Sequence, residues 1–158
     1  MTLPLEVWTL EQRLDHLFKQ TSELPENPEV QANWARYLCV LVSGYIEVAA
    51  IAIYTEYAAN SASPQVARFV SGRLASVANA NWERYLQLLG SFDKDMRDAL
   101  EAMNVDGTKE AFDAVVANRN QIAHGKDTGI TFHRIKEYYS KIQKEIHRLS
   151  NDILPGAL

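Results

Sequence analysis

The most chemically suggestive stretch of this chain runs from Arg119 to Gly125 and reads RNQIAHG. It closes a predicted helix that begins near Thr108. Asn120 and His124 are four residues apart, so they lie on one side of the last helical turn. Gly125 supplies the left-handed residue that commonly ends a helix. An arginine, an asparagine and a histidine are therefore expected together at one helix C-terminus.

These side-chain types suit cleavage of an RNA phosphodiester without a metal ion. A neutral imidazole at His124 can take the proton from a ribose 2′-OH, and an imidazolium can give one to the departing 5′-oxygen. The guanidinium of Arg119 matches the equatorial oxygens of the phosphorane and stabilises its charge more than that of the ground state. The amide of Asn120 can fix the imidazole or a phosphate oxygen. We therefore predict Arg119, Asn120 and His124 as catalytic residues.

The number of histidines in this stretch predicts a homodimer. Each chain carries one, whereas separate acid and base steps need two proton-transferring groups. A twofold dimer would bring two copies of the helix end over one cleft. Arg119 lies on the apolar stripe of its helix, three residues after Val116 and three before Ile122, which fits a helix end that lines such an interface.

Structural explanations of the same residues stay open at this point. A guanidinium on an apolar stripe needs an anionic partner, and Arg119 could pair with Glu47, the single charged residue between Arg36 and Glu56. Glu47 is equally well explained as a structural partner or as a supporting site residue that orients Arg119 or His124. The dipole of the helix C-terminus favours a charged His124, which would be a capping role without chemistry.

Composition describes an ordinary globular chain. Of its 158 residues, 47% are apolar and 23% are charged, which excludes a disordered protein. The lone Cys39 excludes an intramolecular disulfide and sits in an apolar run, where a small core residue is expected. The N-terminus has no basic region followed by an apolar core, so we expect no signal peptide and a cytoplasmic protein.

The net charge of −4 argues against a general nucleic-acid binder, although its distribution is uneven. Residues 109–158 hold eight basic and six acidic groups, a surplus of two positive charges around the Arg119 stretch. A solvated helix face explains this surplus as well as an anion-attracting patch does. His16, His133 and His147 have no cysteine or carboxylate at ligand spacing, so no metal or other cofactor is expected.

Apolar residues recur at helical spacing along the chain, and the alternation typical of strands is absent. The predicted fold is all-α, an up-and-down bundle of five to six helices in a single domain over residues 1–158. Capping and turn residues separate the predicted helices: Asn27, Ser63, either Asn79 or Asn81, Gly90, Thr108 and Thr131, with Pro155 after the last helix.

The longest predicted helix, about residues 28–59, is also the most apolar. A membrane span is conceivable because its uncharged run approaches the roughly 20 residues needed. Glu47 lies in the middle of that run, where a carboxylate costs about 2.5–3.5 kcal/mol on insertion scales. Ser43 and Gly44 also dilute the hydrophobicity. We therefore predict the central, nearly fully buried helix of the bundle and no membrane.

With Arg-Asn-x-x-x-His-Gly ending the penultimate helix of an all-α chain, the sequence resembles the HEPN superfamily. The superfamily signature is an arginine, four to six residues and a histidine, with a polar residue directly after the arginine. Arg119, Asn120 and His124 match it position by position. The segments SGYIE at 43–47 and GIT at 129–131 also look like the bacterial stand-alone branch, RiboL-PSP or MAE_28990-like. The resemblance covers most of the chain.

The resemblance implies an HEPN-like domain with metal-independent endoribonuclease activity on RNA, acting as a homodimer. The cleaved ends would be a 2′,3′-cyclic phosphate and a 5′-hydroxyl. It also implies the toxin of a toxin–antitoxin pair, with a cognate antitoxin protein as partner, or a phage-defence effector. Some relatives paired with a nucleotidyltransferase antitoxin carry a tyrosine two residues after the histidine. Lys126 stands at that position here, which puts that mode of control in doubt.

Two other functions are compatible with the sequence. A catalytically silent HEPN-like module could bind a nucleotide or a partner protein, and the acidic net charge favours this alternative. The other is a helical adaptor protein in which the motif occurs by chance. The intact Arg119 and His124 favour the enzyme.

Overall fold

The computed structural model describes residues 3–103, 107–154 and 156, and it confirms the predicted all-α class. These ranges contain no strand and seven helices, where the sequence predicted five to six. The sequence also placed the break between two short helices at Gly90, but the first of them continues to Phe92 and the chain becomes extended at Asp93. Pro155, predicted to follow the last helix, lies outside the described residues. The helices are α1 (Leu5–Ser22), α2 (Pro28–Ser61), α3 (Pro64–Leu74), α4 (Trp82–Phe92), α5 (Lys94–Met103), α6 (Thr108–Ala123) and α7 (Phe132–Ile153).

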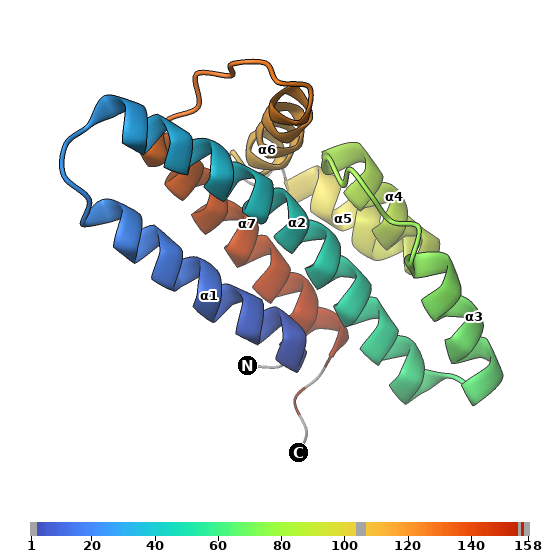
Figure 1. Cartoon of the computed structure of the whole chain (residues 1–158). Helices are drawn as coiled ribbons and strands as arrows, with labels where there is room; N and C mark the ends of the chain where they lie inside the picture. Colours follow the sequence, from blue (N-terminus) through green and yellow to red (C-terminus); the bar gives the residue numbers. More distant parts are fainter. Residues whose placement is uncertain (1–2, 104–106, 155, 157–158) are drawn as a thin grey trace.

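The long apolar helix α2 is the centre of the fold. Asn27 caps it, because its Oδ1 accepts the N–H of Glu29 at 3.1 Å and that of Val30 at 3.2 Å, and Pro28 occupies the first turn. α2 contacts α1, α3, α6 and α7. In Figure 1, α1, α2 and α7 lie side by side, while α3 follows the C-terminal half of α2 and α6 lies over its N-terminal half.

The apolar stretch of α2 is largely inside the protein. By length and composition, α2 is the one helix in the described ranges that could cross a membrane. Within its apolar 18-residue stretch, 61% is buried inside the protein. Tyr45, Ile46 and Ile53 are fully buried or nearly so. This fits the central helix of a bundle, as predicted, but the predicted near-complete burial is wrong, because Tyr37, Val40 and Val48 of α2 are exposed.

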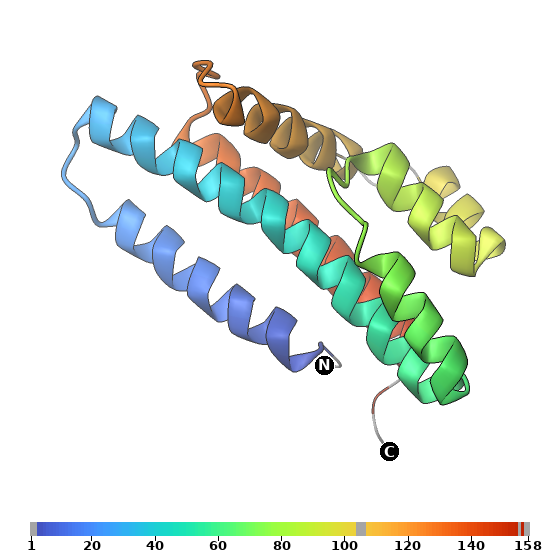
Figure 2. The same cartoon turned by 45° about the vertical axis from the view of Figure 1, so that its right-hand side comes forward.

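The short helices α4 and α5 form a pair set to one side of the long helices (Figure 2). Asn81 caps α4 by accepting the N–H of Arg84 at 3.0 Å. Asp113 of α6 accepts the N–H of Trp82 at 2.9 Å, so α6 holds the first turn of α4. At the start of α6 the N-cap position is Gly107, at φ +75°, and not Thr108 as predicted, because this turn needs a left-handed residue.

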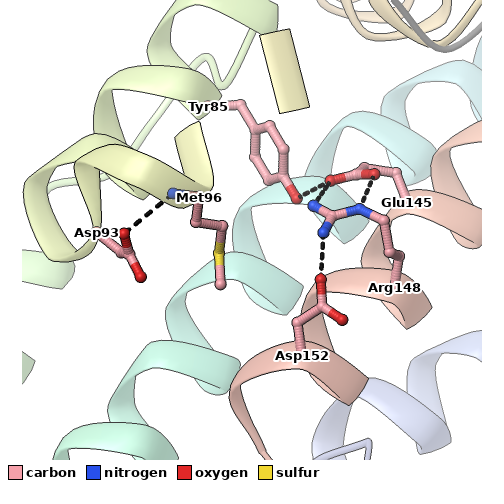
Figure 3. Close-up of polar contacts among 6 residues, drawn as sticks. All are labelled: Tyr85, Asp93, Met96, Glu145, Arg148 and Asp152. Atoms are coloured by element: carbon pink, nitrogen blue, oxygen red, sulfur yellow. Dashed lines mark hydrogen bonds and ion pairs between the residues drawn. The ribbon is translucent and has the colours of Figure 1, made fainter. Parts of the chain in front are cut away.

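A buried ionic cluster joins α7 to α4 (Figure 3). Glu145 is 3% exposed, and its Oε1 accepts the hydroxyl of Tyr85 at 2.8 Å. Arg148 donates to both carboxylate oxygens of Glu145, at 2.6 and 2.8 Å, and to Asp152. Burial, followed by the charge of Glu145, raises the pKa of Tyr85 well above its usual value. The cluster is therefore a satisfied structural contact.

A second buried carboxylate joins α7 to α1 and α2. Glu11 accepts the hydroxyl of Tyr45 at 2.5 Å, and one of its oxygens lies 2.7 Å from Nε2 of His147. Local sequence spacing did not indicate this partner of His147, because Glu11 comes from the other end of the chain. Burial, followed by the hydrogen bond to Glu11, raises the pKa of Tyr45.

Candidate active site

Helix α6 carries the predicted catalytic residues, and its apolar face fixes it to the core. Phe112 and Val115 are fully buried, and Val116 is 4% exposed. The thiol of Cys39 on α2 donates to the carbonyl oxygen of Val115 at 3.5 Å. Burial raises the pKa of that thiol to about 12. The body of α6 is thus anchored on α2, and in its last turn Ile122 still packs against the core while Gln121 and Ala123 are exposed.

The end of α6 is a Schellman motif, the arrangement in which a left-handed residue redirects the chain. His124 is the C-cap, and Gly125 follows at φ +71°. The N–H of Gly125 donates to Ile122 O at 3.0 Å, and the N–H of Lys126 donates to Gln121 O at 2.9 Å. The predicted role of Gly125 is confirmed, and His124 is held at the point where the helix stops.

The structure brings Arg119 and Asn120 together. Nη1 of Arg119 donates to Oδ1 of Asn120 at 3.2 Å, and both residues are half-buried. The backbone N–H of His124 donates to the carbonyl oxygen of Asn120 at 3.2 Å, and the His124 residue is exposed. In the described part of the chain the His124 side chain makes no hydrogen bond or ion pair. The site is therefore a linked Arg–Asn pair beside an imidazole that faces solvent.

Glu47 does not pair with Arg119. Oε1 of Glu47 accepts the N–H of Asn79 at 2.8 Å, in the connection between α3 and α4, where Asn79 has φ +50°. Arg119 is half-exposed, so water can solvate its charge and no buried carboxylate is required. The ion pair considered from the sequence is wrong, and within the described ranges no contact links Glu47 to Arg119, Asn120 or His124.

A residue that the sequence analysis did not select fastens the loop after His124. Nη1 of Arg36, on α2, lies 3.6 Å from Oδ1 of Asp127. The same Asp127 oxygen accepts the N–H of Gly129 at 3.2 Å. The signal was present, because Arg36 is the last charge before the long uncharged run of α2. Its partner is 91 positions away, which no local pattern indicates.

Two other cations after the end of α6, Lys126 and Arg134, differ in their contacts. Lys126 is exposed. Arg134 is held on α7, where Nη1 lies 3.4 Å from Glu137 and the guanidinium lies 5.9 Å from the ring centre of Tyr138. The described residues contain no group of three or more His, Cys, Asp or Glu side chains placed to hold a metal ion. The groups available for chemistry at the end of α6 are therefore the guanidinium of Arg119, the amide of Asn120 and the imidazole of His124. Lys126 adds a positive charge nearby.

A groove of about 790 Å³ lies between α4, α5 and α6 and reaches this site through Asn120. Its α6 wall runs from Lys109 to Asn120, and its other walls include Trp82 of α4 and Arg97 of α5. The groove is thus joined to the Arg–Asn pair at one end.

Comparison with known proteins gives one clear match. A family model described as RiboL-PSP-HEPN matches residues 9–154, which is most of the chain. No curated protein and no solved structure gives a significant match.

Proposed function

Because the chain belongs to the RiboL-PSP-HEPN family, we propose that it is a metal-independent endoribonuclease with Arg119, Asn120 and His124 as its catalytic residues. The observation that carries the proposal is the hydrogen-bonded pair of Arg119 and Asn120 beside an exposed, unengaged His124. A buried or saturated histidine could not exchange protons with a substrate. The match to the family supports a ribonuclease or a nucleotide-binding module, and the state of His124 favours the ribonuclease.

Arg119 stabilises the transition state. One of its five N–H donors is used by Asn120, and that partner is neutral, so the positive charge is not cancelled. The remaining donors can bind the phosphoryl oxygens, where negative charge grows as the 2′-oxygen attacks. The hydrogen bond to Asn120 limits the rotamers of the guanidinium and reduces the entropy lost on binding.

His124 transfers the protons. A neutral imidazole takes the proton of the 2′-OH as the O2′–P bond forms, and an imidazolium returns a proton to O5′ as the P–O5′ bond breaks. The products are a 2′,3′-cyclic phosphate and a 5′-hydroxyl, and no water is consumed.

The enzyme acts as a homodimer in this proposal, with a second His124 from the partner copy. Support comes from an uncharged ridge along α2, over about 38 Å of helix at 1.5 Å per residue. Its residues are exposed or half-exposed, and Leu41 and Ile51 also pack against the core. It contains no cation to attract RNA or an anionic membrane, whereas it is compatible with a copy of itself. A Cβ placed on Gly44 at its centre would meet nothing within 4 Å, so a partner helix could approach closely. The exposed or half-exposed ridge residues are Val30, Asn33, Tyr37, Val40, Leu41, Gly44, Val48, Ile51 and Thr55.

A toxin or phage-defence role in the cytoplasm completes the proposal. Within the described residues no side chain covers His124, so silencing of the enzyme would have to come from another molecule. A cognate antitoxin protein that covers the end of α6 would meet this need. The alternative function, a catalytically silent module that binds a nucleotide or a protein, is favoured by the net charge of −4.

The decisive experiment is cleavage of total RNA and tRNA by the purified chain in EDTA. Wild type is expected to cut and to leave cyclic-phosphate ends, while His124→Ala is expected to be inactive. His16→Ala is the matched control, because His16 is an exposed helical histidine on α1. An inert wild type, or a His124→Ala variant that cuts as well as His16→Ala, would reject the catalytic assignment. Light scattering on the same samples should give a dimer mass that Gly44→Glu reduces to a monomer.

A further inference from the structure

We propose that the groove between α4, α5 and α6 binds a guanine base of the RNA, next to the phosphate held by Arg119. This inference rests on the proposed ribonuclease function, and it adds a base preference that the catalytic residues alone do not give. The groove is continuous with the catalytic residues, because Asn120 both lines the groove and accepts the hydrogen bond of Arg119.

The groove has the dimensions of a ligand site. Its volume of about 790 Å³ falls inside the roughly 300–1,000 Å³ of small-molecule pockets. Lys109, Asp113, Val116 and Asn120 follow one another at helical spacing along one face of α6. Val116 is 4% exposed, which shows that part of the groove lining is apolar and tightly packed. A flat aromatic base can lie against such a surface.

Arg97 is a groove residue with unused hydrogen-bonding capacity. Its Nε is buried and has no hydrogen-bond partner in the described part of the chain. Its two terminal nitrogens lie 3.7 Å from Asp98 and 3.7 Å from Glu101, which is too long for hydrogen bonds. The Arg97 side chain is 37% exposed, so a ligand acceptor can reach its terminal nitrogens, whereas the buried Nε is out of reach.

Gly90 allows Arg97 to take this position. A Cβ added to Gly90 would lie 2.7 Å from Cδ of Arg97, closer than real Cβ contacts come. The Arg97 side chain therefore crosses α4 at the one residue without a side chain, and any other residue at position 90 would displace it. This places Arg97 by packing, as a recognition residue requires.

The charges favour a base over a phosphate. The lining contains two cations, Arg97 and Lys109, and three carboxylates, Glu83, Glu101 and Asp113, so it is slightly acidic. Guanine offers two neighbouring acceptors, O6 and N7, that match an arginine, and two neighbouring donors, N1–H and N2–H, that match a carboxylate. Arg97 and Glu101 supply these partners side by side. Asp113 is already engaged by the N–H of Trp82 at 2.9 Å.

The test is calorimetric titration of the wild-type chain with 5′-GMP, 5′-AMP, 5′-CMP and 5′-UMP. These mononucleotides contain no internucleotide bond, so binding is measured without cleavage. We expect GMP to bind about tenfold more tightly than the other three, the difference that one good base contact gives. Equal binding of all four, or no binding, would overturn the inference.

Two variants locate the binding. Arg97→Gln should remove the preference for GMP, and Gly90→Ala should weaken GMP binding while Arg97 is still present. The matched controls are Arg68→Gln and Gly72→Ala on α3, where the added Cβ meets nothing within 4 Å. Circular dichroism checks that each variant folds. GMP binding that survives both groove variants would overturn the inference as well.

The two proposals can fail separately. A chain that binds GMP in this groove but never cleaves RNA would reject the ribonuclease and keep the guanine site. A chain that cleaves RNA through His124 but does not bind GMP, and that cuts equally beside all four bases, would keep the ribonuclease and reject the guanine site.

Discussion

Two pairs of an arginine and a histidine, one on α7 and one at the end of α6, have opposite surroundings. On α7, His147 and Arg148 meet buried carboxylates: His147 lies 2.7 Å from Glu11, and Arg148 donates to Glu145 at 2.6 Å. On α6, Arg119 meets only the neutral amide of Asn120, and in the described residues the His124 side chain meets nothing. The same two residue types are thus saturated at one place and left available at the other.

The difference follows from burial. Glu11 and Glu145 are each 3% exposed, and a carboxylate in such a place must be paired and hydrogen-bonded. The hydrogen bond to Glu145 raises the pKa of Arg148, so its charge is fixed and used for structure. The end of α6 projects into solvent, where water can solvate charge at small cost. Charged groups at the end of α6 can therefore remain unpaired until a ligand binds, without destabilising the fold.

The comparison predicts that loss of Arg119 affects activity and hardly affects stability. Arg119→Ala should lower the cleavage rate by about 10²–10³-fold, as removal of one transition-state donor does. The melting temperature should stay within about 1–2 °C of wild type, because a half-exposed side chain with one neutral partner contributes little. Single-turnover cleavage assays and thermal unfolding by circular dichroism measure the two effects. Arg68→Ala, an exposed arginine on α3, is the control.

A stability loss in Arg119→Ala as large as that expected for Arg148 below would break the comparison. So would a cleavage rate equal to that of Arg68→Ala. The first result would make Arg119 a structural residue, and the second would leave His124 without its proposed partner in the transition state.

Loss of Arg148 should have the reverse effect. Among the described residues, Arg148→Ala leaves the buried Glu145 carboxylate with the Tyr85 hydroxyl as its one partner, which should destabilise the fold by about 3 kcal/mol. For a chain of this size that corresponds to a melting temperature roughly 6–12 °C lower. The cleavage rate per folded molecule should not change. Urea denaturation gives the free energy of unfolding, and Arg148→Ala with Glu145→Gln should recover part of it.

The recovery in that double variant separates two explanations. If the buried charge is the problem, a neutral residue at 145 removes it. If the double variant is less stable than Arg148→Ala alone, packing of the Arg148 stem is the larger contribution, and the ionic argument for α7 is wrong.

The parts of the molecule that sequence could predict are those with local causes. The stop at Gly125, the cap at Asn27 and the apolar character of α2 depend on neighbouring residues, and the structure confirms them. The HEPN family was also predicted from the RNQIAHG stretch, and the match over residues 9–154 confirms it.

What sequence could not predict depends on distant partners. Arg36 meets Asp127, Glu47 meets Asn79, and Glu11 meets His147 only because helices far apart in the chain pack together. The groove has the same origin, since its three walls come from α4, α5 and α6. A charge on a helical stripe indicates that a partner is needed, and it does not identify the partner. That is why Glu47 was paired with the wrong group.

The smallest expected effect concerns the turn that presents His124. Gly125 and Gly72 both have open space around an added Cβ, so neither substitution to alanine causes a clash. They differ in backbone conformation, because Gly125 has φ +71° whereas Gly72 lies within the helix α3. Gly125→Ala should therefore destabilise the fold by about 1 kcal/mol, and Gly72→Ala should stabilise it by about 0.5–1 kcal/mol.

Gly125→Asn sharpens this prediction, because asparagine tolerates the left-handed conformation better than alanine does. In urea denaturation, the free energy of unfolding of Gly125→Asn should lie between those of wild type and Gly125→Ala. Gly125→Asn should also keep more cleavage activity than Gly125→Ala. A Gly125→Ala chain as stable as wild type would mean that the end of α6 can change its path without cost. His124 would then not be held by the turn, and the fixed position assumed for the imidazole would have to come from the substrate or from the partner copy.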